Sequence, residues 1–172
     1  MIEVGAYTLR PWHGDDTAFV FEACQDPDVA RWTTVPSPYR AADAAAFVGS
    51  HAVPQPETSS AWFAMTRTDT GELLGSISIN TFDRVAGTGE IGYWLAWEAR
   101  GAGVAATCLD GMARWGFTDL GLTEVRALVA EGNLRSQRVA ERAGFQAEEI
   151  LPGRCRDGDR PDDAIVYVRR SV

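Results

Sequence analysis

The stretch Ile91–Ala106, IGYWLAWEARGAGVAA, constrains the fold more than any other part of the sequence. An apolar run typical of a strand leads into a basic turn with two glycines, and a helix is predicted to follow directly. The first turn of a helix has backbone N–H groups without partners, and together with the helix dipole they attract anions such as a pyrophosphate. Gly101 and Gly103 suit a backbone that must approach phosphate oxygens closely, and Arg100 adds positive charge. The chain must therefore place a strand, a phosphate-binding turn and a helix in succession.

Length and composition predict a single domain spanning residues 1–172. A chain of 172 residues, 45% of them hydrophobic, can build a real core and leaves little room for a second one. The N-terminus lacks a basic segment followed by an apolar core, and no apolar run is long enough to cross a bilayer. We therefore expect a cytoplasmic protein with no membrane partner.

The net charge of −8 makes nucleic acid an unfavourable partner, because phosphates would be repelled and no run of basic residues stands out. It favours basic substrates only slightly, since acidity also serves solubility. Metal and disulfide sites are not expected either. Cys24, Cys108 and Cys155 are widely spaced without a CxxC pair, and only His13 and His51 could add imidazole ligands.

The rest of the pattern predicts helices and strands around an antiparallel meander. A strand, a helix and a short helical turn are expected first, at Tyr7–Trp12, after Asp15 or Asp16, and at Val29–Trp32. Then come a loop at Thr33–Tyr39, a helix at Ala41–His51, a loop at Val53–Ser60, and strands at Ala61–Arg67, Glu72–Phe82 and Gly89–Leu95. The second half predicts helix Ala102–Asp119, strand Glu124–Ala130, helix Leu134–Ala143, strand Phe145–Leu151, polar loop Pro152–Asp163 and strand Ala164–Arg170.

This order of elements resembles the GNAT superfamily of acyl-CoA-dependent N-acyltransferases over nearly the whole chain. In that family an [Arg/Gln]-x-x-Gly-x-[Gly/Ala] turn follows the fourth strand, and Arg100, Gly103 and Ala105 match it. The segments IGYWL…RGAG, EGNLRSQRVAERAGF and DPDVARWTTVPSPY are similar to the RimJ/RimL-like branch of ribosomal-protein N-terminal acetyltransferases. The resemblance implies an α/β fold with a mixed, mostly antiparallel sheet flanked by helices. The sheet would be splayed between its fourth and fifth strands, Gly89–Leu95 and Glu124–Ala130.

The resemblance also implies acetyl-CoA as co-substrate and assigns residues to it. The backbone of Tyr93, Trp94 and Leu95 would hold the pantetheine arm and the acetyl group, and an N–H near Leu95 would polarise the thioester carbonyl. The residues expected to hold the pyrophosphate are Arg100, Gly101, Ala102, Gly103, Val104, Ala105 and Ala106.

The glycine turn has a second interpretation. Gly101-x-Gly103-x-x-Ala106, with Glu131 after the next strand, imitates a dinucleotide-binding fingerprint. A dinucleotide fold would open with this motif and then alternate several strands and helices. Here the motif follows three hairpin-linked strands with little chain left, which favours CoA.

Asn133 and Ser136 begin the helix after the strand Glu124–Ala130. The resemblance implies that Asn133 bonds the pantetheine, and that Ser136 lies near the sulfur and protonates or solvates the departing thiolate. Both residues could instead serve only the helix start, because Asn is a preferred N-cap. Many GNAT enzymes carry a tyrosine acid seven residues beyond this asparagine, where this chain has Ala140.

Arg135 and Arg138 follow on the same helix. By the same resemblance they could reach the adenosine 3′-phosphate of CoA, and an ordinary surface position suits them equally. An acceptor amine must lose its proton before it can attack a thioester. Glu90 is the candidate base, because its strand lies next to the expected carbonyl, but strand alternation does not say which face it occupies. A chain of waters as base, and a merely solvated glutamate, remain alternatives.

Trp32, Tyr39 and Trp97 are expected to line the acceptor pocket, where aromatic faces attract a cationic amine. Core packing is the alternative for several tryptophans in so small a domain.

The reaction implied is direct transfer of an acetyl group from acetyl-CoA to a primary amine, without a covalent enzyme intermediate. The acceptor could be a protein N-terminus, or a small-molecule amine such as an aminoglycoside, a polyamine or an amino-acid derivative. A non-catalytic acyl-CoA-binding module is a third possibility, because the tyrosine acid is missing. Homodimers paired through an edge strand are common among GNAT relatives, and a homodimer stays open here.

Overall fold

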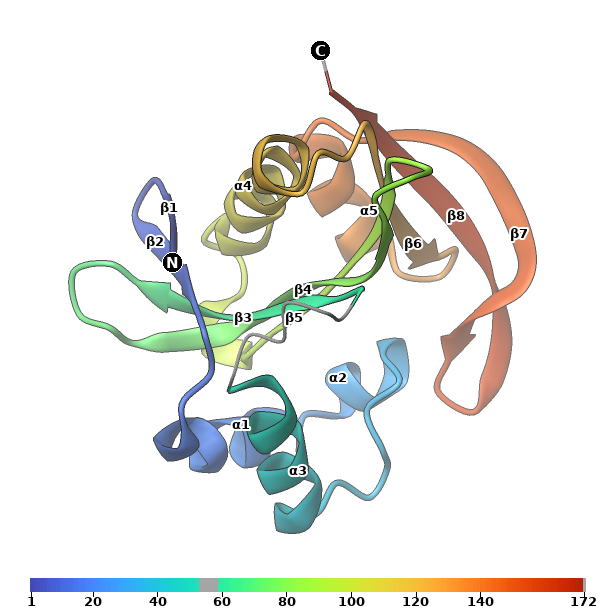
Figure 1. Cartoon of the computed structure of the whole chain (residues 1–172). Coiled ribbons are helices and arrows are strands. Elements are labelled where there is room, and N and C mark those ends of the chain that lie inside the picture. The colour runs from blue at the N-terminus through green and yellow to red at the C-terminus, as the bar shows by residue number, and fades with distance from the viewer. Residues whose placement is uncertain (53–58, 172) are drawn as a thin grey trace.

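A mixed β-sheet forms the centre of the structure, a computed structural model that describes residues 1–52 and 59–171. The strands found in these residues are β1 (Ile2–Val4), β2 (Tyr7–Arg10), β3 (Ala61–Arg67), β4 (Leu73–Asp83), β5 (Thr88–Leu95), β6 (Glu124–Ala130), β7 (Gln146–Asp157) and β8 (Arg160–Arg170). They lie in the order β1-β2-β3-β4-β5-β6-β8-β7 (Figure 1). Neighbouring strands are antiparallel except for β5 and β6, which are parallel. The expected mixed, mostly antiparallel sheet is confirmed.

Helices cover both faces of this sheet (Figure 1). One face carries α4 (Val104–Asp119) and α5 (Leu134–Arg142), and the other carries α1 (Thr17–Ala23), α2 (Pro27–Trp32) and α3 (Ala41–His51). Two short 3-10 turns, η1 (Gly14–Asp16) and η2 (Trp97–Ala99), precede α1 and α4. In the described ranges, no helix combines the length and the hydropathy that crossing a membrane requires.

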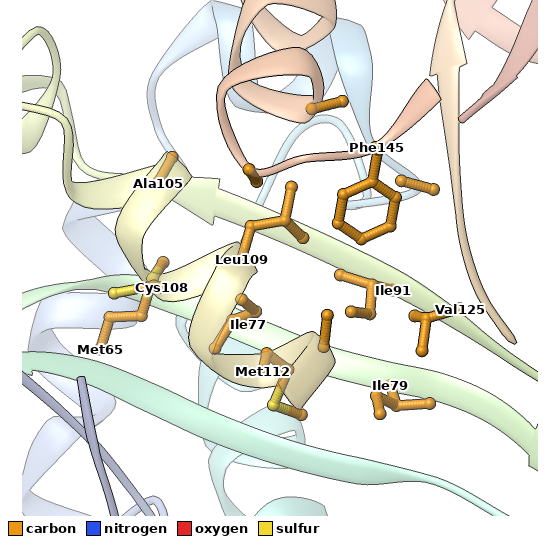
Figure 2. Packing of buried hydrophobic residues seen from close by; sticks show 14 of the residues in the cluster. Met65, Ile77, Ile79, Ile91, Ala105, Cys108, Leu109, Met112, Val125 and Phe145 are labelled. Carbon is orange, nitrogen blue, oxygen red and sulfur yellow. The ribbon is translucent and has the colours of Figure 1, made fainter. Parts of the chain in front are cut away.

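Each helical layer packs its own apolar core against the sheet, which fixes the central strands between two hydrophobic contacts. The core under α4 is shown in Figure 2, where the labelled side chains are Met65, Ile77, Ile79, Ile91, Ala105, Cys108, Leu109, Met112, Val125 and Phe145. The core under α1 and α3 includes Trp12, Val20, Ala44, Val48 and Trp94. Strand β4 is consequently buried on both faces along most of its length.

Most predicted elements occur where the sequence pattern places them. Three of them, at Ala41–His51, Ala61–Arg67 and Glu124–Ala130, have the predicted bounds. The helix predicted from Ala102 begins two residues later, because Gly103 adopts a positive φ of 81° and forms the N-cap of α4. The loop predicted at 53–60 lies mostly outside the described residues.

The predicted polar loop at Pro152–Asp163 is wrong. β7 and β8 continue through it as one long hairpin that turns at Gly158, where φ is +62°. β8 pairs with β6 over Ala164–Arg170, and β7 pairs with the other side of β8 and forms the exposed edge of the sheet. An exposed edge strand needs no apolar alternation, so its usual sequence signal is absent. The short strand β1 escaped prediction as well, because it is only three residues long.

A buried ion pair connects β2 to the first helical layer. The two guanidinium nitrogens of Arg10 donate to the two carboxylate oxygens of Asp16, each at 2.8 Å. The backbone N–H of His13 also donates to Asp16 at 2.8 Å. Burial alone would raise the pKa of Asp16, but the hydrogen bonds from Arg10 and His13 lower it below its usual value. Such a carboxyl stabilises the fold above its unfolded pKa, and the stabilisation is lost as the pH falls through the folded value.

Asp16→Asn should lower the free energy of unfolding by about 3 kcal/mol at pH 7, because Arg10 would stay buried without its partner. Urea unfolding measures this loss. The control Asp15→Asn changes an exposed neighbour and should cost less than about 0.5 kcal/mol. The difference in the free energy of unfolding between wild type and Asp16→Asn should narrow as the pH falls below about 4. Equal losses in the two variants, or a gap independent of pH, would contradict this assignment.

Candidate active site

A cleft opens where β5 and β6 separate. The two strands pair only over their first three residues, Thr88–Glu90 with Glu124–Arg126. Beyond that point Ile91–Leu95 makes no further pair with β6, and it faces Ala127–Ala130 across the cleft. The opposite edge of β5 remains paired with β4. The cleft has a volume of about 1320 Å³, and one of its walls is the edge of β5 that β6 leaves unpaired.

The turn after β5 borders this cleft and has the backbone that the sequence predicts. Gly101 and Gly103 have φ values of +83° and +81°, in the left-handed region that favours glycine. Space is open within 4 Å of the position that a Cβ would take at either glycine. Ala105 and Ala106, in the first turn of α4, also line the cleft. Their helix N-terminus offers unpaired N–H groups and the positive end of a helix dipole.

Arg100 ties this turn to α2. Its guanidinium donates to the backbone carbonyl of Leu95 at 3.0 and 3.3 Å. It also forms ion pairs with Asp26 at 2.7 Å and with Asp28 at 3.4 Å. The positive charge expected at the turn is thus shared with two carboxylates, and the side chain fixes the end of β5 against the start of α2.

The start of α5 forms the facing wall. Asn133 is the N-cap of α5, and its Oδ1 accepts the backbone N–H of Ser136 at 3.1 Å. The hydroxyl of Ser136 lies 2.8 Å from that of Tyr93, which reaches it from β5. Burial raises the pKa of Tyr93 to about 12, although the hydrogen bond with Ser136 lowers it. From the sequence, only the backbone of Tyr93 was given a role. Strand alternation could indicate which face of the sheet its side chain occupies, but it could not identify Ser136 as the partner of that side chain.

Glu90 lies on the other face of β5. Tyr93 and Leu95 pack toward the core under α4, whereas Trp94 packs into the core under α1 and α3. By strand alternation Glu90 shares the face of Trp94. The half-buried side chain of Glu90 lines the cleft. Within the described ranges, its carboxylate forms no hydrogen bond and no ion pair. Ser78 and Asn80 of β4 line the same part of the cleft.

The three predicted acceptor residues, Trp32, Tyr39 and Trp97, all line the cleft. Trp32 and Tyr39 line it from α2 and the following loop, and Trp97 lines it from η2, where it is 62% exposed with the Arg100 guanidinium 5.4 Å from its ring. The ring of Trp94 stacks on Trp12 and Phe19, which leaves its backbone for the cleft edge.

The remaining predicted residues occupy different environments. Arg138 is exposed and lines the cleft, and Arg135 is ion-paired with Asp28 at 3.2 Å. Ala102 and Val104 are not among the residues that line the cleft. Val104 is 3% exposed in the core under α4, and Ala102 is exposed.

The tip of the β7–β8 hairpin closes the side of the cleft beside α2. Asp157 forms an ion pair with Arg31, and the N–H of Gly158 donates to the carbonyl of Arg31 at 2.9 Å. Cys155, which sequence analysis treated only as an isolated thiol, lines the cleft from this hairpin, and burial raises its pKa. In the described part of the chain, no group of three or more His, Cys, Asp and Glu side chains could hold a metal ion.

Residues 7–146 match the family model of the acetyltransferase (GNAT) domain. The chain belongs to the GNAT acetyltransferase family. The membership inferred from the strand order and the glycine turn is therefore confirmed, and the chain is an acyltransferase.

Two curated GNAT relatives come from Bacillus subtilis (strain 168). YdaF, provisionally named a ribosomal N-acetyltransferase, is 39% identical over 88 residues, which cover 51% of this chain and 46% of YdaF. YoaA, an uncharacterized N-acetyltransferase, is 26% identical over 167 residues, covering 97% of this chain and 94% of YoaA. The first similarity is higher but extends over only about half of each protein.

Solved GNAT structures share this fold at low identity. RimJ of Mycobacterium smegmatis, in complex with CoA-disulfide, aligns with a TM-score of 0.86 at 19% identity, covering 99% of this chain and 85% of that one. The microcin self-immunity acetyltransferase MccE, in complex with acetyl-CoA and AMP, aligns with a TM-score of 0.85 at 16% identity. The alignment covers 97% of this chain and 93% of MccE. Spermidine N-acetyltransferase from Vibrio cholerae, in complex with CoA and spermine, aligns with a TM-score of 0.81 at 19% identity. The alignment covers 96% of this chain and 95% of that one.

Arg100→Met should lower the free energy of unfolding by about 3 kcal/mol, because the Arg100 side chain is only 23% exposed and neutralises Asp26 and Asp28. Urea unfolding tests this. Arg135→Met is the matched control, since Arg135 contacts the same Asp28 from a side chain that is 74% exposed, and it should cost less than about 1 kcal/mol. Comparable losses in both variants would show that Arg100 is no more than a surface partner.

Proposed function

We propose that the chain transfers the acetyl group of acetyl-CoA directly to a primary amine, and that this amine is a protein N-terminus. One observation carries the proposal: β5 and β6 stop pairing after three residues and leave the edge of Ile91–Leu95 open to a ligand. An extended molecule can bond to such an edge as another strand would. The pantetheine arm of CoA has amide groups suited to that pairing.

The residues around the cleft fit acetyl-CoA along its length. The backbone of Tyr93, Trp94 and Leu95 would bond the pantetheine arm, with Asn133 on the facing wall. The left-handed turn at Gly101–Gly103 and the first turn of α4 would hold the pyrophosphate. Acetyl-CoA supplies an activated thioester carbonyl. A cleft of about 1320 Å³ exceeds the roughly 300–1,000 Å³ of an ordinary small-molecule pocket, so donor and acceptor can be held together.

Two side chains on opposite sides of β5 are assigned to the proton transfers. Glu90 faces the acceptor side and would take the proton of the attacking amine, directly or through water. Ser136 faces the sulfur side and would donate a hydrogen bond to the departing thiolate. The carbon–nitrogen bond forms as the carbon–sulfur bond breaks, and no enzyme residue becomes acylated.

The acceptor class rests on similarity to named relatives. YdaF carries the name of a ribosomal N-acetyltransferase and RimJ shares the fold, which favours a protein N-terminus. Spermidine N-acetyltransferase shares the fold too, and Trp32 and Tyr39 in the cleft would also suit a cationic polyamine.

A thiol-release assay with acetyl-CoA separates these possibilities when it is run against N-terminal peptides, polyamines and aminoglycosides. Turnover with peptides that requires a free α-amine supports the proposal. Turnover only with polyamines or aminoglycosides overturns the acceptor class but keeps the chemistry. Calorimetric binding of CoA without any turnover would indicate a binding module.

Gly103→Glu should abolish CoA binding, because a carboxylate at the N-cap of α4 would occupy and repel the pyrophosphate position. Gly103→Ala is the matched control. It adds the same left-handed strain, about 1 kcal/mol, without charge, and should lower CoA affinity less than about tenfold. Calorimetry measures both. Retained CoA affinity in folded Gly103→Glu would remove the turn from the CoA site.

Glu90→Gln should lower kcat about 100-fold at pH 7, where the base must deprotonate the amine, and much less near pH 9, where an α-amine is already neutral. A pH profile of kcat checks this. Glu98→Gln is the control, since Glu98 also lines the cleft but is exposed on η2. A pH-independent loss in Glu90→Gln would point to a structural role, and an unchanged rate would leave water as the base.

A further inference from the structure

The hydroxyl pair between Tyr93 and Ser136 spans the cleft from β5 to α5. The two oxygens lie 2.8 Å apart, and both residues line the cleft. Each partner is fixed independently. The ring of Tyr93 packs against the core under α4, and the backbone N–H of Ser136 is held by Asn133 at 3.1 Å.

Building on the proposed function, we propose that Tyr93 is the positioning residue for Ser136. Its phenol donates to Ser136 Oγ, so that the serine hydrogen points into the cleft toward the leaving sulfur.

The need for such a partner follows from the freedom of a serine hydroxyl. Near a helix start it can turn back to bond the local backbone, and several rotamers are open to it. A phenol has one hydrogen to donate, and an oxygen that accepts it keeps its own hydrogen for another acceptor. The bond from Tyr93 therefore selects the Ser136 orientation in which the second hydrogen bond points away from the tyrosine.

Tyr93 itself remains protonated. Burial raises its pKa to about 12, whereas a thiol titrates near 8.5, so proton transfer from the phenol to the thiolate is unfavourable. The pair instead stabilises the thiolate by hydrogen bonding while the carbon–sulfur bond breaks. The sulfur keeps the electron pair of that bond and takes its proton from solvent, and the amine proton leaves on the opposite side of β5.

The arrangement also explains how the chain manages without a tyrosine on α5. Position 140 is an alanine that is 1% exposed in the core under α4. Alanine carries no hydroxyl, and the phenol comes from the facing strand instead.

The experiment measures kcat and KM for acetyl-CoA in wild type, Tyr93→Phe, Ser136→Ala and the double variant, with the best acceptor of the panel above. Tyr167→Phe is the control, because Tyr167 is also buried and its hydroxyl bonds to α5, at Glu141, with an oxygen separation of 3.4 Å. Ser136→Thr keeps a hydroxyl and tests rescue.

Ser136→Ala should lower kcat about 100-fold and Tyr93→Phe about tenfold, with KM for acetyl-CoA within about twofold of wild type. The double variant should be no slower than Ser136→Ala, because a residue that acts through Ser136 has nothing to position once the hydroxyl is gone. Ser136→Thr should recover part of the rate, and Tyr167→Phe should match wild type.

Multiplicative losses in the double variant would overturn the proposal, as would an unchanged kcat in Tyr93→Phe. A raised KM with unchanged kcat would make Tyr93 a binding residue instead. A wild-type protein that binds acetyl-CoA but acetylates no amine overturns the proposed function and this inference together, whereas an active wild type with insensitive Tyr93→Phe overturns only the inference.

Discussion

The three-residue pairing between β5 and β6 is the constraint on which the site depends. If the strands paired along their full length, the edge of Ile91–Leu95 would be satisfied within the sheet and no cleft would exist. Separation has a cost, because unpaired backbone groups in a partly buried place lose hydrogen bonds. Cores on both faces of the central strands offset that cost and hold the sheet in its splayed form.

The two faces of β5 would divide the proposed chemistry. Tyr93 belongs to the face under α4, beside Ser136, whereas Glu90 belongs to the face covered by α1 and α3. An acetyl group held at the strand edge between them would meet an amine from one face and release its sulfur on the other. Strand alternation, the simplest property of a β-strand, would thus keep the proton acceptor and the hydrogen-bond donor apart.

The sequence predicted the parts of the fold that depend on local chemistry. The turn at Gly101–Gly103 was predictable because glycine alone suits its φ values, and α4 was predictable because its apolar positions recur with helical spacing. The hairpin through residues 152–163 was not, since it pairs only within itself, beyond the part of β8 that contacts β6, and the exposed strand β7 shows no apolar alternation.

In the site, the residue types were predictable but several partners were not. Arg100 matched a phosphate-binding motif, yet Asp26 and Asp28, distant in sequence, share its charge. The side chain of Tyr93 meets Ser136 only because β5 and α5 come together in space. Such contacts arise from tertiary packing, which single-sequence patterns do not encode.

The hairpin that replaces the predicted loop forms a separate wall of the cleft. The elements assigned to the acyl donor, β5, α4 and the start of α5, lie apart from the hairpin tip, which meets Arg31 of α2. Because this tip is joined to α2 through Arg31, a change in its length or charge would reshape the wall of the cleft beside α2 while leaving β5 and the first turn of α4 in place.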